Sequence, residues 1–290
     1  MKSQVFVDTS YLIYFLMFSA FTSWQKKTGL EDDPSRDLSV DKDFLWFFEK
    51  KLTAKLADIT KIINHYTEND TERLPIIFAR DSSNKNNWRI AKFPSYKIRR
   101  RTETIKPFNI GLCFNHIILH VLGSNEITNT YNIIPVKSNR AEGDDIIATL
   151  VKYSNADRNL ILASDYDFLQ LHSDKTKIVT LFGDEMSFKK FCDSDDITDA
   201  KQFLLLKILF GDHADCVPHV FKGGGKKTCI KLIKEPEKLQ EKLKNDEIAR
   251  KQFELNRDII DMACIPAEIE REILTDYMAA VENYKNSRII

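Results

Sequence analysis

Residues 159–167 read Asn-Leu-Ile-Leu-Ala-Ser-Asp-Tyr-Asp, an apolar run that ends in two carboxylates. The run is short and lacks a helical period, which is typical of a buried strand. In an open α/β sheet, residues just beyond the carboxyl ends of the strands meet in one crevice. We therefore expect Asp165 and Asp167 to lie at the mouth of such a crevice.

Acidic residues stand beside other apolar runs in the same way, such as Asp8 after residues 5–7 and Asp81 after residues 76–80. A single aspartate after a strand is usually a turn former or a helix cap. Three of the acidic sets are paired, and pairs are hard to assign to capping alone. The whole set comprises Asp8, Asp81, Glu142, Asp144, Asp145, Asp165, Asp167, Asp212 and Asp215.

This set predicts a metal centre. Nine carboxylates in one crevice would repel one another strongly unless cations neutralised them. Hard divalent metals with oxygen ligands are the natural partners, Mg²⁺ above all. A cluster of this kind indicates two-metal phosphoryl chemistry. We expect two Mg²⁺ ions, with Mn²⁺ able to substitute for them.

Basic residues are concentrated in two stretches, although the formal net charge is zero. Residues 85–106 carry eight lysines and arginines against one acid, and residues 222–234 carry five lysines and no acid. Basic surfaces beside an acidic pocket suit a polyanion held across a metal site.

Other residue types exclude several classes of protein. The five cysteines are scattered and lack CxxC spacing, which favours reduced thiols over a disulfide framework or a zinc site. No apolar run is long enough to span a bilayer, so no membrane association is expected. The six histidines show no metal-ligand pattern and are expected in the core or on the surface. A cytoplasmic protein is expected, in the host cytoplasm if the source is viral.

Strand-like runs alternate with helical patterns in the first two thirds of the chain, at residues 4–7, 75–79, 131–136 and 159–163. One more strand or a hairpin is expected within residues 177–188. Later patterns are helical, at residues 198–210, 227–233, 236–260 and 266–284. The sequence predicts an α/β fold with a mainly parallel central sheet flanked by helices in residues 1–192, and an α-helical C-terminal part in residues 193–290.

The motifs resemble those of the 5′-nuclease family, which includes flap endonucleases and the 5′→3′ exonuclease domain of bacterial DNA polymerase I. They are most similar to the T-even phage ribonuclease H branch. In family order the motifs are Val7-Asp8, Phe78-Ala79-Arg80-Asp81, Tyr96-Lys97-Ile98-Arg99-Arg100, Ala141-Glu142-Gly143-Asp144-Asp145, Ser164-Asp165-Tyr166-Asp167-Phe168 and Gly211-Asp212-His213-Ala214-Asp215. The stretch 256–266 is also similar to that branch.

The resemblance implies roles for these residues. Asp8, Asp81, Glu142 and Asp144 would hold the first metal, and the second would be held or supported by Asp145, Asp165, Asp167, Asp212 and Asp215. Residues 82–106 would form an arch over the site. Within it, Lys97 and Arg100 would contact the scissile phosphate as catalytic cations. Tyr96 would stack against a base, and Arg99 and Arg101 would contact nucleic acid.

Residues 212–233 resemble the helix–three-turn–helix with which the family grips duplex DNA, often together with a potassium ion. The residues expected to contact the duplex are Lys222, Gly223, Gly225, Lys226, Lys227 and Thr228. His219 stands where the family has a turn glycine, Gly224 stands where it has an apolar residue, and one residue is inserted. Potassium therefore remains a candidate cofactor, although these differences from the family pattern disfavour it.

The sequence predicts a metal-dependent 5′-nuclease that acts on 5′ ends or flaps of duplex DNA and on RNA–DNA hybrids. Such an enzyme, with ribonuclease H activity, would remove RNA primers and flaps during DNA replication. A monomer is expected, with a single-strand-binding protein or a sliding clamp as possible partners. One alternative is a PIN-like ribonuclease, which the lengths of residues 82–106 and 215–233 disfavour. The other is a catalytically inactive duplex-DNA-binding protein, which the complete carboxylate set disfavours.

Overall fold

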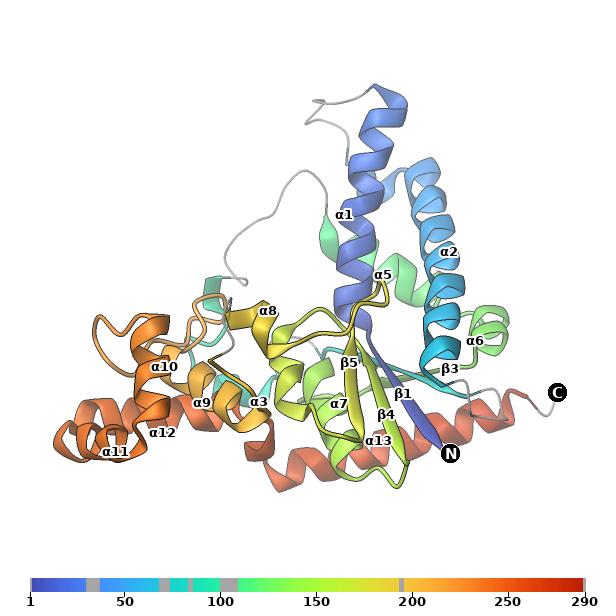
Figure 1. Cartoon of the computed structure of the whole chain (residues 1–290). Coiled ribbons are helices and arrows are strands. Elements are labelled where there is room, and N and C mark those ends of the chain that lie inside the picture. The colour runs from blue at the N-terminus through green and yellow to red at the C-terminus, as the bar shows by residue number, and fades with distance from the viewer. Residues whose placement is uncertain are drawn as a thin grey trace.

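Five parallel strands form the centre of the fold (Figure 1). The computed structural model describes residues 2–29, 37–67, 74–82, 86–99, 109–192 and 196–288. The strands lie in the order β3-β2-β1-β4-β5. Their bounds are β1 Ser3–Asp8, β2 Ile76–Arg80, β3 Ile133–Lys137, β4 Arg158–Leu162 and β5 Thr176–Val179. The expected parallel α/β sheet is confirmed. Of the two alternatives for residues 177–188, the structure has one more strand, β5, with one antiparallel bridge between Val179 and Glu185.

Helices cover both faces of the sheet because its side chains alternate between them. Val5 and Val7 of β1 belong to one apolar core, which includes buried residues of α1 (Thr9–Thr28), α2 (Lys42–Tyr66) and α5 (Ile110–His120). Figure 1 shows α1 and α2 as a pair of long helices that rise beyond the sheet. In the part of the chain that the structure describes, no helix is long and apolar enough to cross a membrane.

Phe6 of β1 belongs to the core on the opposite face. There α7 (Gly143–Lys152) packs against the sheet, and α13 (Ala267–Asn286) runs beneath it (Figure 1). The C-terminal helices form a lobe at one side of the sheet. They are α8 Phe188–Cys192, α9 Ala200–Phe210, α10 Lys226–Lys234, α11 Pro236–Asn245 and α12 Glu247–Ile260. The helical C-terminal part is therefore confirmed, and its core is continuous with that of the sheet.

Several helix bounds differ from those expected. The first helix begins at Thr9 because the Asp8 carboxylate caps it, so Ser10 lies inside the first turn. The expected single helix 236–260 is two helices, since the Asp246 side chain accepts the backbone N–H of Ala249 and starts a new one. A helix that was not expected, α6, spans Asn125–Tyr131. A short 3-10 turn, η1 (Leu38–Val40), lies in the expected loop.

The expected arch segment is described for residue 82 and for residues 86–99. It holds a short helix, α3 (Trp88–Lys92), and then a turn that packs against the C-terminal lobe. Arg100 and Arg101, together with the rest of the segment to residue 106, lie outside the described residues.

Candidate metal centre and nucleic-acid interface

Adjacent strand ends bring the first carboxylates together. Asp8 is the last residue of β1, Asp81 follows β2, and Asp165 comes shortly after β4. Because β2, β1 and β4 are neighbours and parallel, these residues share one edge of the sheet. The N-terminus of α7 joins them there, since the backbone N–H of Gly143 donates to Asp81 Oδ1 at 2.7 Å.

Two connected cavities hold eight of the nine expected metal ligands. The larger has a volume of about 530 Å³ and is lined by Asp8, Asp81, Glu142, Asp144, Asp165 and Asp167. The smaller, of about 50 Å³, is lined by Asp144, Asp165, Asp167, Asp212 and Asp215. The expected convergence of the acidic residues on one crevice is therefore present in the structure. We call the two cavities together the carboxylate cleft.

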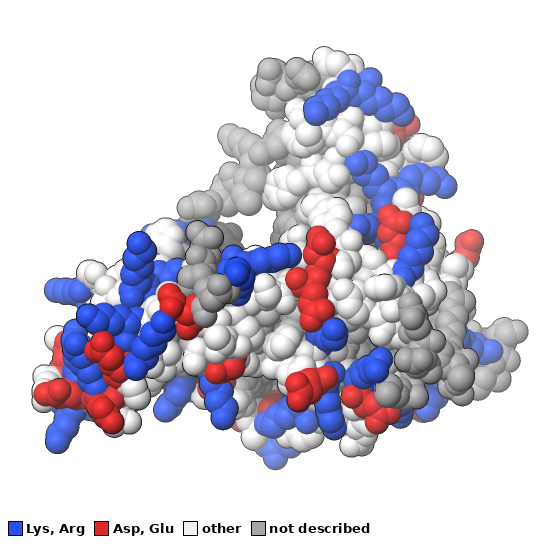
Figure 2. Space-filling view, in the orientation of Figure 1, with Lys and Arg blue, Asp and Glu red and all other residues white. Residues whose placement is uncertain are grey.

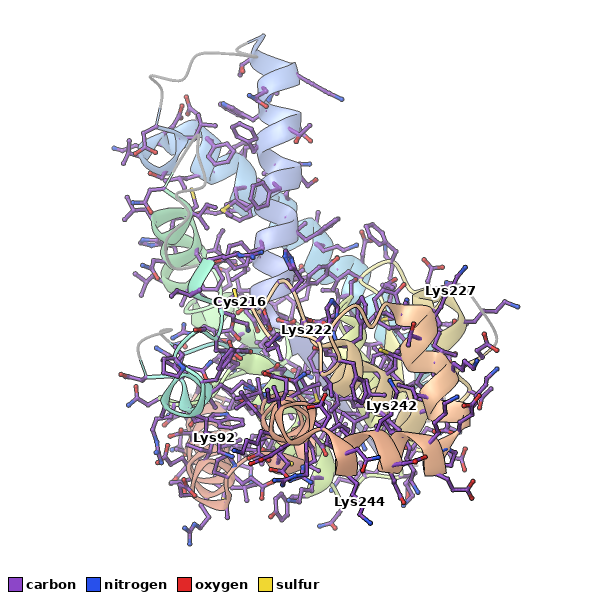
Figure 3. The ribbon with its side chains drawn as sticks, turned by 90° about the vertical axis from the view of Figure 1, so that its left-hand side faces the viewer. Lys92, Cys216, Lys222, Lys227, Lys242 and Lys244 are labelled. Carbon is purple, nitrogen blue, oxygen red and sulfur yellow. The ribbon has the colours of Figure 1, made fainter. Side chains whose placement is uncertain are left out.

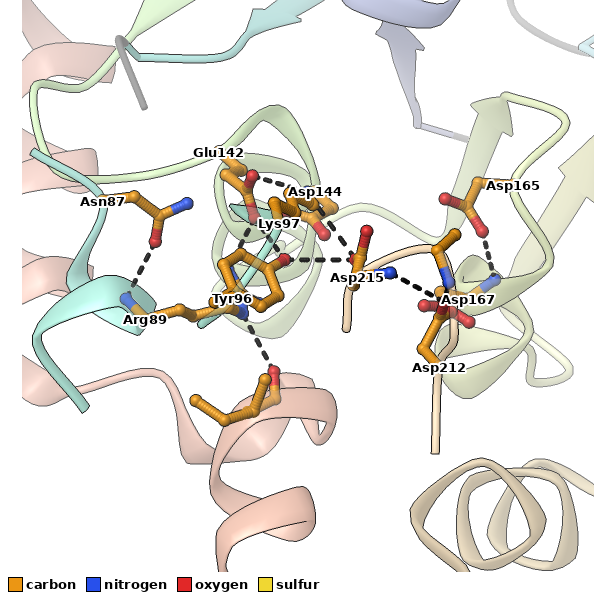
Figure 4. Close-up of polar contacts among 12 residues, drawn as sticks. Asn87, Arg89, Tyr96, Lys97, Glu142, Asp144, Asp165, Asp167, Asp212 and Asp215 are labelled. Atoms are coloured by element: carbon orange, nitrogen blue, oxygen red, sulfur yellow. Dashed lines mark hydrogen bonds and ion pairs between the residues drawn. The ribbon is translucent and has the colours of Figure 1, made fainter. Parts of the chain in front are cut away.

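Glu142 is the centre of a hydrogen-bond network in this cleft (Figure 4). Its carboxylate accepts hydrogen bonds from Lys97 Nζ at 2.6 Å, from the Tyr96 hydroxyl at 2.8 Å and from Arg89 at 3.2 Å. Burial opposes its negative charge, but Lys97 and Arg89 outweigh burial and lower the pKa of Glu142. Glu142 is thus a fixed negative charge at neutral pH.

Lys97 adopts a backbone conformation that is unusual for a residue with a side chain, at φ 52°. Its backbone N–H donates to the carbonyl oxygen of Asp215 at 3.0 Å, which holds the turn in place. The ammonium lies 3.8 Å from the Asp215 carboxylate, so it sits between Glu142 and Asp215. The turn thus places the Lys97 ammonium in the cleft, although Lys97 lies 118 residues before Asp215 in the sequence.

A second lysine, Lys207 of α9, bridges the other side of the cleft. Its Nζ lies 2.8 Å from Asp167 Oδ1 and 2.8 Å from Asp212 Oδ2. Burial opposes its charge, but the two carboxylates outweigh burial and raise the pKa of Lys207. The other oxygen of Asp212 accepts the backbone N–H groups of Ala214 and Asp215. The Asp212 carboxylate therefore holds the conformation of the loop that follows α9.

Asp145 lies behind the cleft instead of lining it. It is fully buried, and its carboxylate accepts the indole N–H of Trp88 at 3.0 Å and two contacts from Arg89 at 2.8 Å. It also accepts the backbone N–H of Glu142, which completes a capping box at the start of α7. In this arrangement Asp145 supports the cleft through Arg89 and Glu142.

The electrostatics of the cleft fit a divalent cation. Desolvation in the cleft and the neighbouring Asp81 raise the pKa of Asp8 to about 7. Desolvation also raises the pKa values of Asp81 and Asp144, each with a neighbouring carboxylate as a further cause. Such groups give up their protons readily only when a cation replaces them. An all-oxygen donor set with this excess of carboxylates suits hard ions such as Mg²⁺.

The structure places one of the expected nucleic-acid contacts, Tyr96, differently from the expectation. The Tyr96 ring is only 3% exposed and packs beside Ile208 and Ile259, so it cannot stack against a base in this conformation. The expected base stacking by Tyr96 is therefore wrong for this conformation. Instead, the Tyr96 hydroxyl donates a hydrogen bond to the Glu142 carboxylate. Arg99 is exposed and contacts the ring of His213 at 2.8 Å.

The expected duplex-binding element consists of α9, a turn and α10. Gly211 ends α9 at φ 68°, and a Cβ there would lie 2.5 Å from two backbone oxygens, those of Val217 and Pro218. The turn is pinned from α12 by Asn256, whose side-chain amide donates to the carbonyls of Ile208 and Pro218 at 2.8 Å each. A rigid turn therefore links the cleft to α10.

The start of α10 presents some, but not all, of the expected lysines to solvent. Lys222, Lys227 and Thr228 are exposed, as are Gly223 and Gly225. Figure 3 shows Lys227 pointing away from the body of the protein. Lys226 turns back instead, donating to the carbonyl of Phe191 at 2.5 Å and lying 4.2 Å from the centre of its ring. Basic side chains gather over this lobe (Figure 2).

Three residues of the centre were missed from sequence: Arg89, Lys207 and Asn256. Arg89 lies in the basic segment, but its burial could not be inferred from its neighbours in the chain. Lys207 stands within an apolar helical run, which marks an unusual position for a lysine and is the one local signal. Asn256 was noted only as part of a similar stretch. Their partners are distant in sequence, so only the fold brings them together.

Comparison with known proteins agrees with this geometry. The family described as 5′-3′ exonuclease, N-terminal resolvase-like domain, matches residues 5–202. DNA polymerase I of Bacillus subtilis (strain 168) is 30% identical over 161 residues, which are 52% of this chain and 18% of that protein. A 5′-3′ exonuclease of the same organism is 33% identical over 109 residues, 36% of each chain. The chain thus spans about a third or less of the length of these relatives.

Solved structures share the fold over nearly the whole chain. A bacteriophage T5 protein co-crystallised with metal ions has a TM-score of 0.64 at 16% identity, covering 96% of this chain and 99% of that one. A bacteriophage T5 flap endonuclease in a complex with DNA and metal ions has a TM-score of 0.63 at 15% identity, covering 97% and 100%. Together with the match over residues 5–202, these findings lead to one conclusion: the chain belongs to the 5′-3′ exonuclease family.

Proposed function

We propose that this protein is a Mg²⁺-dependent 5′→3′ exonuclease and flap endonuclease. It hydrolyses phosphodiester bonds at 5′ ends or flaps of duplex DNA and in RNA–DNA hybrids. The observation that carries this proposal is the carboxylate cleft, which is lined by eight acidic side chains together with Lys97. Acids that bind metal beside a fixed cation suit an attack on a phosphate.

The residues of the chain have distinct tasks in this reaction. Bound in the cleft, two divalent ions would activate a water and stabilise the leaving oxygen. Asp8, Asp81, Glu142 and Asp144 would hold the first ion, and Asp165, Asp167, Asp212 and Asp215 the second. Lys97, and Arg100 three residues later in the same segment, would stabilise the charge that develops on the scissile phosphate. Mn²⁺ can replace Mg²⁺ because both are hard ions with oxygen ligands.

The substrate is a duplex with an unpaired 5′ end. The turn between α9 and α10 leads from the cleft to the exposed Lys222, Lys227 and Thr228, which suits contacts to a duplex backbone on one side of the cleft. In this proposal residues 82–106, which include Lys97, would provide the arch for the unpaired strand. Arg99 and Arg101 contact the nucleic acid there, as do the Gly223 and Gly225 amides at the duplex. A potassium ion at this turn is disfavoured because His219 replaces a glycine and packs on Phe210.

In the cell, the activity would remove RNA primers and 5′ flaps during DNA replication. The similarity to DNA polymerase I supports this role. The protein would act as a monomer in the cytoplasm, in the host cytoplasm if viral, beside a single-strand-binding protein or a sliding clamp. Residues 1–192 would form the catalytic core and residues 193–290 the duplex-binding part.

Cleavage of labelled substrates tests this proposal. A 5′-flapped duplex and an RNA–DNA hybrid are incubated with the protein in Mg²⁺ or in EDTA. We expect products only in Mg²⁺, and we expect the Asp165→Asn variant to bind the flapped duplex but not to cleave it. Cleavage of single-stranded RNA alone would favour the PIN-like ribonuclease, and absence of all cleavage would favour the inactive DNA-binding protein.

A further inference from the structure

Two histidines and a glutamate meet where α2 packs beside α5. His116 and His120 are one turn apart on α5, and their ring centroids lie 4.6 Å apart. Glu49 reaches His116 from α2, and its Oε1 lies 2.6 Å from Nε2 of His116. None of the three lines the carboxylate cleft. The His116 and Glu49 side chains are 23% and 31% exposed, so ions in solution can reach them.

The composition of this cluster is that of a transition-metal site. Two histidines at positions i and i+4 share one face of a helix and can bind one ion together. A set of two histidines and a glutamate is a known donor set for zinc. The histidines alone gave no metal pattern in the sequence because the third donor is 67 residues away from His116.

We propose that Glu49, His116 and His120 form a second metal site, one that takes Zn²⁺ or a similar transition metal. Imidazole nitrogens favour zinc, copper and nickel, whereas the all-carboxylate cleft favours magnesium and manganese. The two sites are therefore separated by ligand chemistry as well as by position. Nothing in the nuclease activity requires this second site.

Binding needs the His120 ring to move, because the donor atoms of the three residues do not all lie within 4.8 Å of one another. The short contact between Glu49 and His116 holds one proton between nitrogen and oxygen, and a metal ion would take the place of that proton. Metal–ligand distances of about 2.0–2.1 Å would then separate the two atoms to roughly 3.3 Å. His120 supplies the third ligand after its ring turns toward the ion. Solvent provides the remaining position, because His120 is exposed.

The position of α5 gives the site a structural consequence. This helix starts at Ile110, shortly after the arch segment 82–106. A metal that joins α5 to α2 would fix the start of α5, which follows that segment in the sequence. This consequence rests on the proposed arch, whereas the metal site itself does not.

Co²⁺ is the probe that tests the site, because its visible absorption depends on its ligands. Four-coordinate Co²⁺ with imidazole ligands absorbs visible light much more strongly than octahedral Co²⁺ with oxygen ligands. The whole 290-residue chain is held in excess Mg²⁺ to occupy the carboxylate cleft, and Co²⁺ is titrated in. We expect one equivalent of the strongly absorbing species, and we expect Zn²⁺ to displace it.

Variants identify the ligands. His116→Gln and His120→Gln should each lose the strong absorption, or lower the Co²⁺ affinity at least about tenfold. The control is His65→Gln, which removes an exposed histidine of α2 and should leave the spectrum unchanged. Mg²⁺-dependent cleavage by each variant confirms that it is folded, and circular dichroism serves instead if the protein is not a nuclease. An unchanged spectrum in both variants, or no strong absorption in the parent protein, would overturn the proposal.

Discussion

Lys97 and Lys207 each place an ammonium group between two carboxylates of the cleft, but we expect the two lysines to have different roles. Lys97 lies between Glu142 and Asp215 at the end of a turn, whereas Lys207 lies inside a helix between Asp167 and Asp212. Both reduce the repulsion among the acids when no metal is present. Lys97 alone comes from the segment that we propose to face the substrate, so the proposed catalytic role falls to it.

Replacing Lys97 by alanine tests this assignment. The variant should cleave a 5′-flapped duplex roughly 10²–10³-fold more slowly in single turnovers, because it lacks a donor that acts on the transition state. Its affinity for the same DNA should change much less. Lys92→Ala is the matched control, since Lys92 belongs to the same segment but pairs with Asp258 outside the cleft. A loss confined to affinity would make Lys97 a phosphate anchor.

The turn between α9 and α10 depends on two glycines in different ways. Gly211 and Gly223 both have positive φ, at 68° and 71°. A Cβ on Gly211 would collide with two backbone oxygens, whereas a Cβ on Gly223 meets nothing within 4 Å. Gly223→Ala should therefore cost only the strain of the backbone, about 1 kcal/mol. Gly211→Ala should cost about 3 kcal/mol or more, because overpacking adds to the strain.

Urea unfolding of the two variants measures this difference. The Gly211→Ala variant should also lose Mg²⁺-dependent cleavage, since Asp212 is the next residue and its carboxylate is held by this turn. Equal free energies of unfolding for the two variants would show that the turn is free to adjust around Gly211.

Lys227, the exposed lysine at the start of α10, is expected to contact a duplex phosphate. Lys227→Ala should weaken duplex binding and reduce the salt slope of the binding constant by about 0.9, the value for one phosphate contact. Lys226→Ala should reduce the slope less, because Lys226 is bound to the carbonyl of Phe191. Lys61→Ala on α2 is the surface control. Fluorescence anisotropy at several salt concentrations would show whether Lys226 instead leaves Phe191 and binds a phosphate.

Elements were predicted from sequence wherever one local signal dominated. Short apolar runs identified the strands, and the carboxylate after each run identified the cleft. The break at Asp246 was missed because apolar residues continue at helical spacing on both sides of it. The helix α6 was missed because the segment has none of its residues buried and so lacks an apolar stripe. The buried position of Tyr96 depends on Ile208 and Ile259, which only tertiary packing brings near.

At the scale of the whole molecule, the cleft ties stability to pH and to metal. The pKa of Asp8 is about 7, whereas an unfolded aspartate titrates near pH ~3.9. Between these values the native state keeps a proton that the unfolded chain has lost, so the metal-free protein becomes less stable as pH rises through this window. Asp81 and Asp144 shift in the same direction. Glu142 and Asp212 shift in the opposite direction, and their contribution is lost only under more acidic conditions.

Thermal melts in EDTA and in Mg²⁺ test this linkage at pH 5.5 and at pH 8. Mg²⁺ binds the deprotonated cleft, so it should raise the Tm little at pH 5.5 and by at least about 3 °C at pH 8, roughly 1 kcal/mol for a chain of this size. The Asp8→Asn variant should melt higher than the parent in EDTA at pH 8. A metal effect independent of pH would contradict the assigned protonation states.

The hydrogen bond from the Lys97 backbone N–H to the Asp215 carbonyl limits where the chain can be cut into active fragments. The family match ends at residue 202, before Lys207, Asp212 and Asp215. A fragment cut there would keep seven of the nine acids and lose Asp212 and Asp215, and with Asp215 the anchor of the turn that carries Lys97. Neither fragment would be active by itself, so fusing one of them alone to another protein would not transfer the nuclease activity. Two fragments mixed together, by contrast, could complement each other, and recovered cleavage would then report their association.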